Sequence, residues 1–173
     1  MNNNPVIMKQ PVPAKTVFTD PVHFLAFGFG AGLAPFAPGT FGTVVGIAFE
    51  LPLRLLSMPA RVAVIVAMFA FGVWLCGESA RRLQTHDHPG IVWDEIVGFL
   101  ITMLVAPPGW HWLLAGFVLF RIFDILKPWP IREMDHSIRG GAGIMLDDVA
   151  AGLYAAVVLY ALQHVPGIPA GWL

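Results

Sequence analysis

Long apolar runs separated by short polar stretches dominate the sequence. The clearest run is uncharged from Val62 to Gly77 and is followed by Glu78, Arg81 and Arg82. About 20 apolar residues in a helix are enough to cross a hydrocarbon core of roughly 30 Å. The pattern therefore predicts a membrane-spanning helix from residue 61 to about residue 83.

The N-terminal part predicts shorter elements. Residues 1–20 are polar and contain proline, and we expect a flexible tail before a single domain over 21–173. The segment 21–38 is apolar but rich in glycine, and its helix of about 14 residues is too short to span, which predicts a re-entrant or interfacial helix. A further helix is expected from the turn at 38–43 to about residue 56. Threonine hydroxyl groups would cap it, and its Glu50 and Arg54 would pair one turn apart.

The run from Ile96 to Phe120 carries no charge, but Pro-Pro-Gly interrupts it at 107–109. It predicts either one kinked span or a helical hairpin whose first arm is short for a full span. With a cytoplasmic N-terminus, the hairpin places seven basic residues inside (Lys9, Lys15, Arg81, Arg82, Lys127, Arg132 and Arg139) and two outside (Arg54 and Arg61). A single span would place four basic residues inside and five outside. Because basic residues concentrate on the cytoplasmic side of membrane proteins, the hairpin is favoured.

The hairpin would bring five carboxylates to one membrane boundary. Asp94 and Glu95 precede the interrupted run, and Asp124 follows it. Asp147 and Asp148 lie between the glycine-rich stretch 140–143 and the uncharged run 149–163. Removing a carboxylate from water costs several kcal/mol unless a cation or hydrogen bonds compensate. The five acids are therefore expected to share a positively charged partner.

Magnesium suits this arrangement, because Mg²⁺ commonly binds one or two carboxylates together with substrate phosphate oxygens. The predicted catalytic residues are Asp94, Glu95, Asp124, Asp147 and Asp148, and the predicted Mg²⁺ ligands are Glu95, Asp124, Asp147 and Asp148. Arg121 and Lys127 lie on the same side of a helix as Asp124 and would bind a phosphate. The same spacing of three also fits a ladder of ion pairs within the helix, and the sequence leaves both interpretations open.

Composition supports a membrane protein and excludes a nucleic-acid-binding surface. Apolar residues make up 57% of the 173 residues, charged residues 12%, and the mean hydropathy is +0.71. These values predict an all-α, multi-spanning membrane helical bundle. The net charge of -1, without basic runs interleaved with aromatic residues, does not suit nucleic acid. The patterns leave open whether the protein is an oligomer.

Four motifs, in this order, make the chain resemble the phosphatidylglycerophosphatase A family. They are Pro-Gly-Thr-Phe-Gly-Thr at 38–43, His-Asp-His at 86–88 leading to Ile-Val-Trp-Asp-Glu at 91–95, the stretch 120–131 with Lys-Pro-Trp-Pro-Ile, and 140–148 with its two aspartates. The resemblance implies a helical, Mg²⁺-dependent phosphatase of the bacterial inner membrane with its active site facing the cytoplasm. The implied reaction converts the phospholipid phosphatidylglycerophosphate into phosphatidylglycerol and inorganic phosphate. Thr40, Thr43 and Arg139 become further candidates for binding the phosphate.

Some alternatives remain at this stage. The attacking group could be water or one of the carboxylates, and the roles of His86, Asp87 and His88 are open. An ion or proton transporter is the rival function, because acids in membrane helices often mark conduction paths. The expected clustering of the acids at one boundary argues against transport.

Overall fold

The computed structural model describes residues 12–85, 88–133, 138 and 140–165, and these residues form helices and no strands. Short elements come first: α1 (Ala14–Thr19), α2 (Pro21–Ala26) and the 3₁₀ segment η1 (Gly28–Leu33). The longer helices are α3 (Pro38–Leu53), α4 (Met58–Arg82), α5 (Trp93–Thr102), α6 (Trp110–Leu126) and α8 (Gly141–Leu162), with the 3₁₀ turn η2 (Met103–Val105) after α5. The all-helical prediction is confirmed for the described residues.

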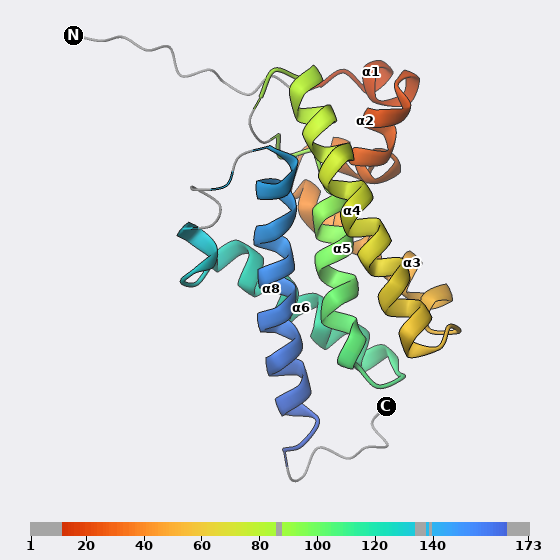
Figure 1. Cartoon of the computed structure of the whole chain (residues 1–173), viewed down its shortest axis with the longest axis vertical. Helices are drawn as coiled ribbons and strands as arrows, with labels where there is room; N and C mark the ends of the chain where they lie inside the picture. The colour runs from red at the N-terminus through yellow and green to blue at the C-terminus, as the bar shows by residue number, and fades with distance from the viewer. Residues whose placement is uncertain (1–11, 86–87, 134–137, 139, 166–173) are drawn as a thin grey trace, which may run out of the picture.

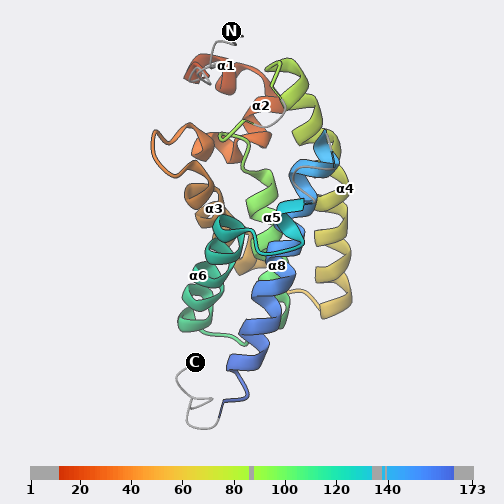
Figure 2. The same ribbon diagram turned by 90° about the vertical axis from the view of Figure 1, so that its left-hand side faces the viewer.

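Helix α5 lies at the centre of the bundle, where α3, α4, α6 and α8 all contact it (Figures 1 and 2). Eight of its ten residues are buried. Its closest neighbour is α8, because glycines occupy the crossing: a Cβ on Gly152 would overlap the carbonyl oxygen of Gly98. Small residues at a helix crossing let the two backbones approach closely. This contact fixes the start of α5 beside the start of α8.

The predicted hairpin is confirmed as a reversal of the chain. After α5 and η2 the chain turns through 106–109, and α6 runs back so that its C-terminal end lies beside the N-terminal end of α5. Arg121 Nη1 lies 3.9 Å from Glu95 Oε1, which documents this return. The acids on these two helices therefore meet at the same end of the bundle.

A buried ionic cluster holds the other end of the bundle together. Glu50 is fully buried and accepts hydrogen bonds from Arg54 (2.8 Å) and Arg61 (2.5 Å), so the predicted pairing of Glu50 with Arg54 is confirmed. Arg61 also donates to the carbonyl of Met103, and Arg54 donates to the carbonyl of Pro107. The cluster thus ties α3 and α4 to the turn between α5 and α6.

The N-terminal region differs from its prediction in two ways. The tail was expected through residue 20, but α1 begins at Ala14 and Val17 is fully buried, so the ordered part starts earlier. The single helix expected over 21–38 is also wrong. Gly28, Phe29 and Gly30 adopt positive φ angles, which end α2 and start η1. A right-handed helix cannot continue through such residues.

Side chains anchor α2 to the end of α4. Arg82 pairs with Asp20 at 2.7 Å, and His23 Nδ1 lies 2.9 Å from Ser79 Oγ in a buried hydrogen bond. Burial lowers the pKa of His23, and the neighbouring Asp20 carboxylate opposes this shift. A neutral imidazole at this contact keeps α2 docked without a buried charge.

Helices α4 and α8 are long and apolar enough to cross a membrane. The predicted span over 61–83 corresponds to α4, which is 25 residues long, or about 37 Å at 1.5 Å per residue. Most of its apolar stretch faces outward, whereas more than half of that of α8 is buried in the bundle. The arrangement therefore contains one long outward-facing apolar helix and one long apolar helix that is largely internal.

Candidate active site

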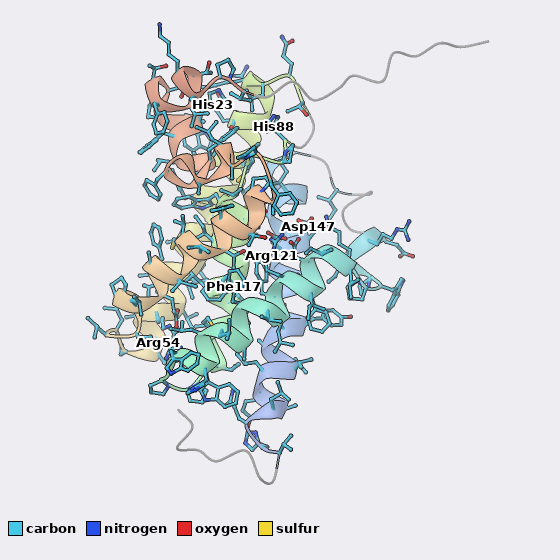
Figure 3. The ribbon with its side chains drawn as sticks, turned by 180° about the vertical axis from the view of Figure 1, so that it is seen from behind. His23, Arg54, His88, Phe117, Arg121 and Asp147 are labelled. Atoms are coloured by element: carbon cyan, nitrogen blue, oxygen red, sulfur yellow. The ribbon has the colours of Figure 1, made fainter. Side chains whose placement is uncertain are left out.

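A polar cavity of about 240 Å³ opens where α3, α5, α6 and α8 meet. Asp147 and Arg121 mark it in Figure 3, between the ribbons of α6 and α8. All five predicted carboxylates line it. Its lining residues are Ala37, Pro38, Gly39, Pro89, Ile91, Asp94, Glu95, Arg121, Asp124, Lys127, Asp147 and Asp148.

Three carboxylates form the tightest part of the cavity. One oxygen atom each from Asp94, Glu95 and Asp148 lies within 4.8 Å of the other two. Asp94 and Glu95 belong to the first turn of α5, and Asp148 belongs to the second turn of α8, so the α5–α8 crossing brings them together. Asp94 and Asp148 are each at least nine-tenths buried. Like charges at this separation repel each other unless a cation or protons lie between them.

The other two carboxylates each have a basic partner. Arg121 Nη1 lies 2.7 Å from Asp124 Oδ2, and Lys127 Nζ lies 2.6 Å from Asp147 Oδ2. The first pair is internal to α6, as in a helix ladder, but the second joins the end of α6 to α8. Lys127 reaches α8 because it ends α6 in the left-handed conformation, with φ of 41°. The ladder interpretation therefore fits Arg121, whereas the pair of Lys127 with Asp147 connects two helices.

Several polar atoms in the cavity wall are buried without a hydrogen-bond partner. They are Glu95 Oε2, Arg121 Nε and Arg121 Nη1; the last lies close to Asp124 but not in hydrogen-bond geometry. A buried polar atom without a partner costs roughly 1–3 kcal/mol. An unpaired carboxylate oxygen suits a cation, and unpaired guanidinium N–H groups suit a phosphate oxygen. The donor set consequently fits a hard divalent cation together with a phosphate.

Gly39 forms the wall of the cavity opposite these groups. A Cβ at this position would overlap Glu95 Oε1 and lie 3.0 Å from Arg121 Nη1. The absent side chain leaves the backbone of α3 directly against the carboxylate and the guanidinium. The role of Gly39 was not predicted from the sequence beyond its place in a glycine-rich motif. The signal that could have identified it is a glycine in the first turn of a helix, at a position whose backbone conformation does not require glycine.

The two threonines predicted to bind phosphate do not line the cavity. Thr43 is fully buried, and its hydroxyl donates to the carbonyl of Gly39 at 2.9 Å. The predicted threonine capping is also wrong, because α3 begins after Ala37 without a side-chain cap. Thr40 is half-buried on the same helix, outside the cavity lining.

The histidine motif and Arg139 are only partly within the described residues. His88 is placed in the loop before α5, where its Nδ1 accepts a hydrogen bond from Gly90 N and its ring packs on Phe27. Its neighbour Pro89 lines the cavity. His86, Asp87 and Arg139 lie outside the described residues. Their suggested roles stay predictions.

Comparison with known proteins connects this cavity to one family. The family profile described as phosphatidylglycerophosphatase A matches residues 24–163, a range that includes every residue lining the cavity. A phosphatidylglycerophosphatase A from Escherichia coli (strain K12) is 42% identical over 157 residues, covering 90% of this chain and 91% of that protein. One from Haemophilus influenzae is 43% identical over 160 residues, covering 91% and 98%. No solved structure matches the chain.

Proposed function

The chain belongs to the phosphatidylglycerophosphatase A family, and from that premise we propose that its cavity hydrolyses phosphatidylglycerophosphate. The products are phosphatidylglycerol and inorganic phosphate. The observation that carries the proposal is the gathering of five carboxylates, one arginine and one lysine in a single cavity of about 240 Å³. A phosphomonoester is small and doubly charged, so it needs both cationic groups and a means of offsetting the carboxylates.

Arg121 and Lys127 are the groups that would hold the phosphoryl oxygens. The unpaired N–H groups of Arg121 can donate to one oxygen while the guanidinium keeps its contact with Asp124. Lys127 is already fixed beside Asp147 and presents its charge to the same cavity. Donors placed in advance can stabilise negative charge that develops during phosphoryl transfer without reorganising.

Asp94, Glu95 and Asp148 are the residues that would hold Mg²⁺, because their oxygens are close together and Glu95 Oε2 has no other partner. Bound there, Mg²⁺ would offset the charge on the phosphoryl oxygens and lower the pKa of a coordinated water molecule. Asp124 and Asp147, each beside a basic group, would orient that group. The nucleophile is either water or a carboxylate, and acid quenching followed by a search for phosphate bound to protein distinguishes the two.

We place the cavity at the cytoplasmic boundary of a multi-spanning bundle. Asp94 lies in the first turn of α5, Asp124 in the last turn of α6, and Asp147 about 9 Å from the start of α8. Arg81 and Arg82 end α4 on the same side as these helix ends (Figure 1), whereas Arg54 and Arg61 lie near the opposite end. The distribution of basic residues supports a cytoplasmic site.

A transporter is not supported by this arrangement. The five acids gather in one cavity instead of following a path through the bundle. Glu50, the acid buried near the opposite end, is held by Arg54 and Arg61. An acid neutralised by two guanidinium groups is poorly suited to carry ions or protons.

The test measures phosphate release by the purified protein from phosphatidylglycerophosphate, phosphatidate and a soluble phosphomonoester, with Mg²⁺ and with a chelator. We expect hydrolysis of phosphatidylglycerophosphate that chelation abolishes and that added Mg²⁺ restores. Asp148→Asn should lower kcat by about a hundredfold to a thousandfold, as the loss of one charge-stabilising group commonly does. Full activity in chelator would contradict the metal site.

Glu78→Gln is the matched control. Like Asp148, Glu78 is an acid. It pairs with Arg81 and Arg82 and lies on the surface of α4, away from the cavity. This variant should keep the activity of the unaltered protein. Full activity of Asp148→Asn, or equal losses in the two variants, would refute the assignment of the cavity.

A further inference from the structure

Helices α3 and α6 each carry an exposed apolar stripe next to the polar cavity. On α3 the stripe consists of Phe41, Val44 and Leu51, which are all at least half exposed. On α6 it consists of Leu114, Val118, Ile122 and Ile125, which are 43% to 67% exposed. Spacings of three, four and seven residues place each set along one side of its helix. Both stripes are therefore continuous apolar surfaces and not scattered residues.

The cavity lies where these two helices come together. Gly39 of α3 and Arg121 of α6 both line it, and a Cβ on Gly39 would lie 3.0 Å from the Arg121 guanidinium. Phe41 follows the lining residue Pro38 by three positions, and Ile125 follows Arg121 by four, so each lies one turn from the cavity on the same side of its helix. In Figure 3, α3 and α6 lie on the same face of the molecule, with Arg121 near the upper ends of both and Phe117 further down α6. Each stripe thus begins at the cavity and runs away from it along that face.

This combination suits an amphiphile with one highly charged end. A phosphomonoester fits a cavity that holds Arg121 and Lys127, whereas acyl chains gain free energy against apolar side chains in proportion to the area removed from water. The continuity of the stripes with the cavity identifies the occupant as a molecule that uses both.

We propose that the phospholipid substrate enters the cavity sideways from the bilayer, between α3 and α6, and that its acyl chains lie against the α3 and α6 stripes. The inference rests on the proposed function and adds the route and the residues that position the lipid. Phe41, Val44, Ile122 and Ile125 are positioning residues, because they would contact the acyl chains and not the reacting phosphate.

The experiment compares a long-chain phosphatidylglycerophosphate in mixed micelles with a water-soluble dihexanoyl analogue. The test variant is Phe41→Asn with Ile122→Asn. It should raise the KM for the long-chain substrate by about tenfold, the effect of losing the burial of one or two apolar side chains, and leave kcat/KM for the soluble analogue unchanged. The control is Val66→Asn with Val157→Asn, which alters exposed residues of α4 and α8 that do not line the cavity. It should change neither value.

Two results would overturn the proposal: equal losses on both substrates, or an equal rise in KM in the control variant. Equal losses on both substrates would mean that the stripes are needed for folding and not for positioning the lipid. An equal rise in KM in the control variant would mean that any exposed apolar helix face has the same effect. If the unaltered protein hydrolyses neither substrate, the proposed function itself fails, so the two failures are distinguishable.

A second measurement uses the unaltered protein and does not depend on the folding of variants. A non-hydrolysable phosphonate analogue with a diazirine on one acyl chain is photolysed in the bound state, and the modified residues are identified by mass spectrometry. Modification of α3 and α6 that an excess of unlabelled analogue suppresses is the expected result. Modification confined to α4 and α8, or unaffected by the competitor, would exclude the route.

Discussion

At the scale of single residues, the cavity depends on the smallest residue in its wall. Gly39 lets the first turn of α3 lie directly against Glu95 and Arg121. An added methyl group would overlap Glu95 Oε1 and force this carboxylate to move. Helix propensity would favour alanine at this position, so the glycine serves the site and not the helix.

Gly39→Ala should therefore lower kcat/KM by about a hundredfold while the protein stays folded, because displacing a positioning group by about 1 Å can cost that much. Steady-state kinetics and the thermal unfolding midpoint in detergent check both parts. Glu78→Gln, on α4 away from the cavity, is the control and should change neither. Unchanged kinetics for Gly39→Ala would show that Glu95 and Arg121 can shift without consequence.

Residue types and spacings predicted most of the cavity. All five carboxylates, Arg121 and Lys127 line it. The two threonines predicted to bind phosphate lie outside the cavity lining, because spacing along the chain does not fix how a helix is rotated about its axis. Thr43 lies one turn after Gly39 but points inward, where its hydroxyl binds a backbone carbonyl. The left-handed end of α6, which brings Lys127 to Asp147, also has no signal in the sequence.

At the scale of helices, the buried cluster of Glu50, Arg54 and Arg61 determines how α3 and α4 meet the α5–α6 turn. Glu50 supplies the negative charge that both guanidinium groups face. Removing one member of a buried ionic cluster leaves the others desolvated and uncompensated. The cluster is therefore a condition for the hairpin geometry.

Glu50→Gln should destabilise the protein by roughly 3–5 kcal/mol, the usual consequence of breaking a buried ion pair from one side. The measurement is the thermal unfolding midpoint in detergent, which should fall clearly below that of the unaltered protein. Glu78→Gln again provides the control, because its solvent-screened pairs with Arg81 and Arg82 contribute little to the free energy of unfolding. Equal midpoints for the two variants would contradict a structural role for the cluster.

The sequence predicted the helices correctly where a single physical rule dominated. Apolar length predicted α4, and the Pro-Pro-Gly break together with the distribution of basic residues predicted the hairpin. The prediction was wrong over 21–38, where packing holds three consecutive residues at positive φ. It was also wrong before residue 20, where the burial of Val17 stabilises a short helix of low apolar content.

At the scale of the whole molecule, the polar cavity and the buried ionic cluster are separated along one bundle, because Arg121 and Asp147 lie between His23 and Arg54 in Figure 3. We infer that the cavity end faces the cytoplasm and that the α3–α4 turn faces the other side. Arg132 follows α6 at the cavity end, and Leu55 in the α3–α4 turn is 86% exposed. These two positions report the orientation directly.

Single cysteines at these positions test the topology. Cys76 is the one cysteine of the sequence and is buried, so Cys76→Ala gives the background for Leu55→Cys and Arg132→Cys. A membrane-impermeant maleimide applied to intact spheroplasts should label the first variant, and label the second only after permeabilisation. The reverse pattern would refute the cytoplasmic site.

The central position of α5 has a consequence for how the protein is made. Helix α5 leaves the ribosome before α6 and α8, yet α8 supplies much of its packing and two of the five acids. Until α8 has inserted, Asp94 and Glu95 lack the neighbours that complete the cavity. We therefore expect catalytic competence to arise late in biosynthesis, when α8 joins the bundle.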